Sequence, residues 1–148
     1  MSKILGSTMT KEIRDLLNSK NITVVLATIS EDNYPNTTPI HLITAPSEKK
    51  IRIALGKMHQ SYLNIKANGK IMISILESND MALSIKGNAR IVKDPMDGNK
   101  NMAMVEIDVQ EIKSDTTPTV IVIEGIKIKH RTAKTPEFFR LMFEELNS

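Results

Sequence analysis

The stretch IRIALGKMHQSYLNIKANGKIMISI, residues 51–75, sets the pattern that organises the whole chain. Apolar side chains at both of its ends follow the two-residue period of a half-buried strand: Ile51, Ile53 and Leu55, and then Ile71, Ile73 and Ile75. Between them, residues 56–61 (GKMHQS) form a polar turn, and Leu63, Ile65 and Ala67 with Lys66 predict a short helix. Asn68-Gly69 suits a left-handed helix end. The stretch therefore predicts strand, turn, helix and strand.

The turn in this stretch has the chemistry of a phosphate site. A strand that enters a turn containing Gly56 and Lys57 at the start of a helix offers free backbone N–H groups, a positive dipole end and an ammonium group. Gln60 and Ser61 add hydrogen-bonding side chains. The alternative interpretations are that Ser61 caps a helix beginning at Tyr62 and that Lys57 is a solvated turn lysine.

The remaining elements follow from periodicity and turn residues. Thr10 is a candidate N-cap of a first helix that ends near Asn18-Ser19. Pro39, within the second predicted strand, indicates an edge, a bulge or a place where a ligand replaces the neighbouring strand. Asp94-Pro95 resembles a helix start, and residues 101–113 fit either a helix or a strand. The other predictions are strands at 23–29, 36–44, 81–93 and 119–128, turns at 30–35, 45–50 and 77–80, and a closing helix that begins at Thr135-Pro136-Glu137.

Composition limits the class of protein. The chain has 148 residues, 41% of them hydrophobic and 25% charged, which fits one globular domain spanning residues 1–148. No apolar run reaches the roughly 20 residues that span a bilayer, and the N-terminal residues do not resemble a secretory signal, so we expect a cytoplasmic protein without a membrane segment. The absence of cysteine excludes disulfides and thiolate sites. A net charge of +3 with 3% aromatic residues argues against nucleic-acid binding.

Mostly antiparallel strands joined by short turns favour a β-barrel or sandwich with flanking helices. Four motifs within residues 20–93 then resemble the FMN-binding split-barrel family typified by pyridoxamine 5′-phosphate oxidase, and are most similar to its small stand-alone FMN-binding proteins. In chain order these motifs are Val25–Ile29, then Glu31-Asp32-Asn33 followed by Pro35, then Gly56–Ser61 followed by Asn64-Ile65, and finally Lys86–Ala89.

The resemblance implies a mainly β fold, a six-stranded antiparallel split barrel with short flanking helices. It also implies a homodimer with one non-covalent FMN at each end of the interface, and Gly87 at the dimer seam. The implied cofactor-binding residues form two groups. Thr38, Pro39, Ile40 and His41 would run along the isoalloxazine and ribityl chain, with Leu55, Gly56 and Lys57 beside the ring and Met58 near it. His59 would act as a hydrogen-bond donor, and Gln60 and Ser61 would contact the phosphate. The family often has lysine or arginine near the position of Gln60, and Asp32-Asn33 replaces its Asp-Gly turn.

The resulting hypothesis is an FMN-binding flavoprotein that acts as an oxidoreductase or electron carrier on a small-molecule substrate or redox partner. Lys57 is the candidate for stabilising the anionic reduced flavin at its N1–C2 edge, and no residue is assigned as catalytic. His41 and His59 lack metal-ligand spacing, so no metal is expected. Arg140 is the one arginine in residues 137–148, which argues against a true pyridoxamine phosphate oxidase. The alternatives are a split barrel that binds deazaflavin or haem and a non-catalytic ligand-binding module.

Overall fold

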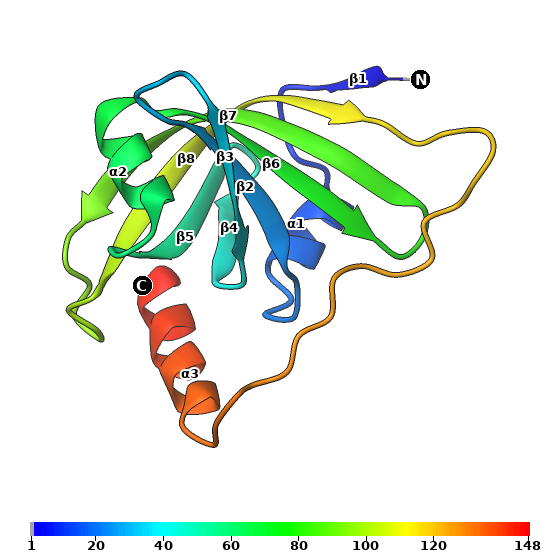
Figure 1. Cartoon of the computed structure of the whole chain (residues 1–148). Coiled ribbons are helices and arrows are strands. Elements are labelled where there is room, and N and C mark those ends of the chain that lie inside the picture. Colours follow the sequence, from blue (N-terminus) through cyan, green and yellow to red (C-terminus); the bar gives the residue numbers. More distant parts are fainter. Residues whose placement is uncertain (1) are drawn as a thin grey trace.

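The computed structural model describes residues 2–148 and consists mainly of antiparallel strands (Figure 1). Its elements, in chain order, are β1 (Lys3–Gly6), α1 (Lys11–Leu17), β2 (Val24–Ile29), β3 (Pro35–Ile40), β4 (Ile43–Ser47), β5 (Lys50–Gly56), α2 (Gln60–Ala67), β6 (Lys70–Glu77), β7 (Met81–Lys93), β8 (Met102–Ser114) and α3 (Thr135–Leu146). The mainly β class is confirmed, with eight strands where six were expected.

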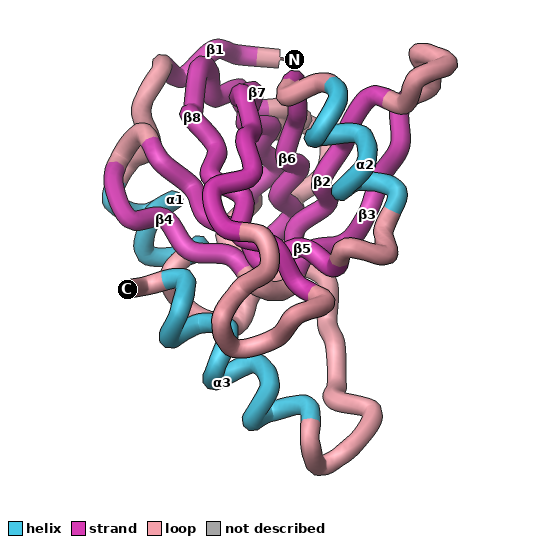
Figure 2. Tube along the Cα trace, turned by 90° about the vertical axis from the view of Figure 1, so that its left-hand side faces the viewer, coloured by secondary structure: helices cyan, strands magenta, loops and turns pink. Residues whose placement is uncertain are grey.

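The strands form one sheet in the order β3-β2-β6-β7-β8-β5-β4, with β1 added beside β8. The predicted strand 36–44 is divided into β3, which pairs with β2, and β4, which pairs with β5. Only His41 and Leu42 separate these two strands along the chain, so the two ends of the strand order meet there and the sheet curves into a split barrel (Figure 2). Relative to the six predicted strands, the division of 36–44, the added β1 and the strand β8 are gains, and the strand predicted at 119–128 does not form.

The interior of the barrel is filled by the apolar side of each strand. Along β6 buried and exposed side chains alternate, and Ile71, Ile73 and Ile75 point inward as predicted. A second, smaller apolar cluster lies beneath α3 and includes Leu42, Ala54, Met96, Met104, Met142, Phe143 and Leu146. At the start of α1 the backbone N–H of Ile13 donates to Oγ1 of Thr10 at 3.3 Å, which confirms the predicted N-cap.

Residues 94–113 contain no helix, so the helix start predicted at Asp94-Pro95 is wrong. Residues 94–101 form turns, and the alternation of Val105, Ile107 and Val109 belongs to β8. A strand prevails over a helix because β8 is paired on both sides, with β5 and with β7.

The strand predicted at 119–128 is also wrong, because residues 115–134 form an extended connection, called here the C-terminal arm (Figure 1). Its β-branched side chains remain between 44% and 78% exposed at Val120, Ile121, Ile123, Ile126 and Ile128. Asp80 holds the arm through two hydrogen bonds with the backbone of Val122, each 3.0 Å long. Within the described chain the arm pairs with no strand, although Gly125 packs against the Leu76 carbonyl oxygen at the end of β6.

Three local predictions also change. The polar turn expected at 45–50 contains the end of β4, where Ala45 is fully buried. Asn68 is extended and Gly69 is not left-handed, but a Cβ at Gly69 would lie 2.5 Å from the Ala89 carbonyl oxygen, so close packing requires that glycine. Gly87 stands at a bulge where a Cβ would lie 2.7 Å from the Asp108 carbonyl oxygen, which is a reason for glycine within one chain.

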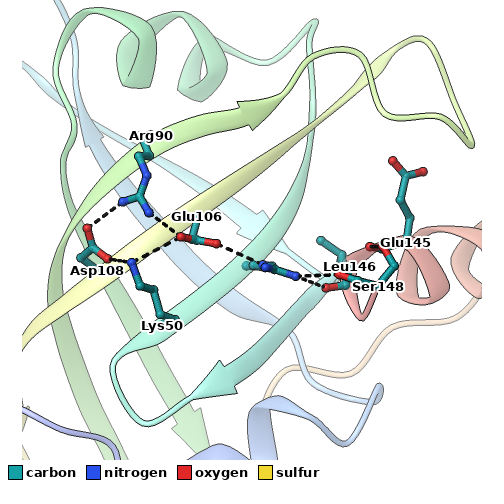
Figure 3. A network of polar contacts seen from close by, with 8 residues as sticks. Lys50, Arg90, Glu106, Asp108, Glu145, Leu146 and Ser148 are labelled. Atoms are coloured by element: carbon teal, nitrogen blue, oxygen red, sulfur yellow. Dashed lines mark hydrogen bonds and ion pairs between the residues drawn. The ribbon is translucent and has the colours of Figure 1, made fainter.

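An ion-pair network fastens α3 to the barrel (Figure 3). Glu106 on β8 accepts hydrogen bonds or ion pairs from Lys50, Arg52 and Arg90. A guanidinium nitrogen of Arg52 also donates to the Leu146 carbonyl oxygen at the end of α3, at 3.1 Å. At the same end of the helix, Glu145 accepts from the backbone N–H groups of residues 97 and 98, each at 2.8 Å. These contacts fix the side of α3 that faces the candidate site.

Candidate functional site

The predicted phosphate turn is a tight segment between β5 and α2, and some of its backbone N–H groups already donate hydrogen bonds to carbonyl oxygens of the chain. The N–H of Lys57 donates to the Asn101 carbonyl at 2.9 Å, and the N–H of His59 donates to the Gly56 carbonyl at 3.1 Å. His59 is the N-cap of α2, without a side-chain capping bond. Two of the turn's N–H groups are therefore already used within the chain.

The ammonium group of Lys57 is neutralised. Its Nζ lies 2.7 Å from Oδ1 of Asp94, and the Tyr62 hydroxyl donates to the other oxygen of that carboxylate. The hydrogen bond with Asp94 raises the pKa of Lys57, and the same bond, followed by that from Tyr62, lowers the pKa of Asp94. An anion arriving at the turn would have to compete with Asp94 for this lysine.

Ser61 is completely buried, with 0% of its surface exposed, and it does not cap α2. Its Oγ lies 2.7 Å from Oγ1 of Thr38 and accepts from the Asn36 amide at 3.1 Å. One turn later, Asn64 donates to Oγ1 of Thr28 at 3.0 Å and accepts from Gln60 at 2.9 Å. These neutral hydrogen bonds tie α2 to β2 and β3, and they engage the Ser61 hydroxyl and one N–H of the Gln60 amide.

Most of the other predicted residues line one depression of about 210 Å³. It brings together Thr38, Pro39, Ile40 and His41 with Leu55, Gly56 and His59, whereas Lys57, Met58, Gln60 and Ser61 are not part of its wall. Met58 is 94% exposed. The depression is also lined by Leu42, Ala54, Met102, Phe138 and Phe139, which the sequence motifs did not indicate. Phe138 and Phe139 reach the depression from α3, so their place in its wall depends on how α3 docks.

Two imidazoles give the depression its polar character. Nδ1 of His41 lies 2.8 Å from Oγ1 of Thr23, and the His41 ring stacks against Phe139 with their centroids 6.4 Å apart. Burial lowers the pKa of His41, which favours the neutral form of the ring. On the opposite side, a Cβ at Gly56 would lie 2.8 Å from Cδ2 of His59, so this glycine makes room for the second imidazole.

Residues 2–148 contain no group of three or more histidine, aspartate or glutamate side chains arranged to hold a metal ion. In the same residues, no helix combines the length and hydrophobicity required to cross a bilayer.

The curved antiparallel sheet, the helix α2 across it and the depression beside Gly56 define a split-barrel protein with a small concave site. The sequence assigns the family: the model of pyridoxamine 5′-phosphate oxidase matches residues 9–130, so the chain belongs to this family. No curated protein matches the chain.

Solved structures support the fold. A Lactobacillus delbrueckii protein with a provisional assignment as pyridoxamine 5′-phosphate oxidase is similar with a TM-score of 0.63 and 21% identity, over 76% of this chain and 98% of that one. An F420 reductase has a TM-score of 0.57 and 19% identity, over 70% and 98%. An FMN-binding protein from Syntrophomonas wolfei has a TM-score of 0.56 and 15% identity, over 67% and 80%.

Proposed function

We propose that this chain binds FMN non-covalently in the 210 Å³ depression and serves as an oxidoreductase or electron carrier, in the cytoplasm. The proposal rests on one observation. Thr38–Ile40 on β3, and His41 directly after that strand, meet Leu55 and Gly56 on β5 in one concave site. These segments are the ones that the family motifs associate with a flavin ring. The similar folds of an FMN-binding protein and an F420 reductase add support for a flavin-type ligand.

A second copy of the chain completes the site in this proposal. Small-molecule sites usually measure about 300–1,000 Å³, which is more than one chain provides here. On the outer face of β2 and β6 the barrel presents partly exposed apolar side chains, namely Val25, Ala27 and Ile29 with Met72 and Leu76. A groove of about 470 Å³ runs over the same face. We propose that this face is the homodimer interface.

The flavin, when bound, supplies hydride or electron transfer, and the chain's residues position it and exclude water. The neutral imidazole of His41, fixed through Thr23, can donate or accept one proton at Nε2. His59 can provide a second hydrogen bond from the opposite wall. The electrostatic role predicted for Lys57 requires its ammonium group to leave Asp94, so the midpoint potential of a Lys57→Ala variant tests that role separately from binding.

The visible absorption spectrum of the purified protein, recorded before and after addition of FMN and desalting, tests the proposal. A flavin band that survives desalting supports it, and a protein that does not retain FMN overturns it. Loading with a deazaflavin in parallel distinguishes the two cofactors, because the deazaflavin band lies at shorter wavelength. Oxidation of reduced nicotinamides by the loaded protein then separates an enzyme from a carrier, since a carrier retains FMN without accelerating this reaction.

A further inference from the structure

A second cavity, of about 610 Å³, lies behind the flavin depression. Its walls come from the end of α1, the start of β2, the turn between β6 and β7, and the part of the C-terminal arm around Ile126. His41 and Phe139 line both cavities, so the stacked pair of rings forms the partition between them. The volume falls within the range of small-molecule sites.

Not every charged side chain on the wall of this cavity has an ion-pair partner. Lys127 is neutralised by an ion pair with Glu124 on the arm itself. Glu77 accepts a hydrogen bond from the Ser78 N–H at 2.9 Å and keeps a second carboxylate oxygen for a donor. Lys20 has no ion pair or hydrogen bond to any other described residue. The cavity therefore offers one free cation and one carboxylate acceptor.

The backbone of Lys20 is unusual. Its φ is 61°, and the other non-glycine residues with positive φ in the described chain are Asn33, Asn79 and Asp80, whose side chains tolerate this conformation. For a lysine this left-handed conformation is strained. An asparagine would fit the backbone better, whereas the lysine that stands here adds a charge to the cavity wall and strain to the turn.

We propose that the 610 Å³ cavity binds a small amphipathic organic acid, with its acidic group on Lys20 and its apolar body against side chains such as Leu16, Ile22 and Ile126. A hydroxyl or amino group on the ligand would donate to Glu77. With a flavin in the neighbouring depression, this ligand would lie on the other side of His41 and Phe139. That pairing rests on the proposed function, whereas the binding itself does not.

The absence of cysteine makes a single introduced thiol a clean reporter. In a Ser78→Cys variant the thiol lies on the cavity wall, and in a Lys100→Cys control it lies on an exposed turn away from the cavity. The rate of thiol modification by a neutral aromatic disulfide is measured in flavin-free protein with and without 1-naphthoate. We expect saturating naphthoate to slow the reaction of S78C at least fivefold and to leave K100C unchanged.

Two variants at Lys20 make the test specific. Lys20→Asn suits the left-handed backbone and should abolish the protection of S78C, whereas Lys20→Arg should retain it. No protection of S78C, or protection that Lys20→Asn does not reduce, overturns the proposal. Equal protection by FMN also overturns it, because the cavity would then belong to the flavin site. If naphthoate protects a protein that fails to retain FMN, the proposed flavin function fails and the organic-acid site stands.

Discussion

Replacing Gly56 by alanine should impair the flavin site while leaving the barrel intact. The new Cβ would lie 2.8 Å from Cδ2 of His59, which is the outer end of an exposed side chain that can turn away. The φ of Gly56 is not in the left-handed region, so alanine adds no backbone strain. The unfolding transition should therefore shift little, while the methyl group and the displaced imidazole occupy space in the 210 Å³ depression.

The expected loss of affinity follows from overpacking. Inserting a methyl group into a closely packed site costs about 1–3 kcal/mol, which corresponds to an about 5- to 140-fold higher Kd for FMN. The assay is titration of FMN fluorescence quenching, with thermal unfolding of the flavin-free protein measured in parallel. Gly69→Ala is the matched control, because its Cβ would lie 2.5 Å from the Ala89 carbonyl oxygen and should reduce stability.

The result that would refute the reasoning is a Kd for Gly56→Ala within twofold of the parent value at unchanged thermal stability. FMN would then not occupy the depression beside His59. A loss of affinity that appears only together with a large loss of stability would equally contradict the local mechanism, because it would place Gly56 with Gly69 among the residues required by the fold.

Three further predictions concern stability. Asn64→Leu removes buried hydrogen bonds to Thr28 and Gln60 and should lower the free energy of unfolding by about 2–4 kcal/mol, measured by urea denaturation. Arg52→Ala removes the donor to the end of α3 and should accelerate hydrogen exchange in that helix, with little change in β6. The hydrogen bond from Lys50 lowers the pKa of Asp108 in the folded protein. The ionised Asp108 therefore stabilises the fold above the unfolded-state pKa of about 3.9, and this stabilisation is lost as the pH falls through the lower folded-state pKa. An Asp108→Asn variant should lose less stability than the parent between about pH 6 and pH 2.

The sequence correctly predicts the strands in which an alternating apolar pattern coincides with neighbouring strands available for pairing. The alternation around Ile73 specifies β6 because neighbouring strands are available on both sides. The C-terminal arm has the same alternation at 119–128 and passes beside the end of β6, but it forms no ladder with any strand of the described chain, so propensity alone predicts a strand that does not form. Residues 101–113 were ambiguous because both periods fit, and only pairing with β5 and β7 decides between them.

For the candidate site, too, the sequence predicts one part correctly and misses another. The motifs located the segments that line the depression, because their order along β3 and β5 is written in the sequence. They did not show which side chains are already engaged. Lys57 is paired with Asp94, and Ser61 with Thr38, through contacts between residues far apart in sequence. Whether a lysine or serine in a phosphate-like turn is free for a ligand therefore depends on tertiary contacts that periodicity does not encode.

The extended C-terminal arm gives α3 the character of a tethered peptide ligand. A flexible connection of about 20 residues has a root-mean-square reach of about 25 Å, and a tether of that kind presents its end at an effective concentration of about millimolar. The docked helix supplies Phe138 and Phe139 to the flavin depression, and Phe139 to the cavity behind it. Cleavage within the arm would make the docking of α3 bimolecular, so at micromolar protein concentration both cavities would lose a wall without any change to the residues of the barrel.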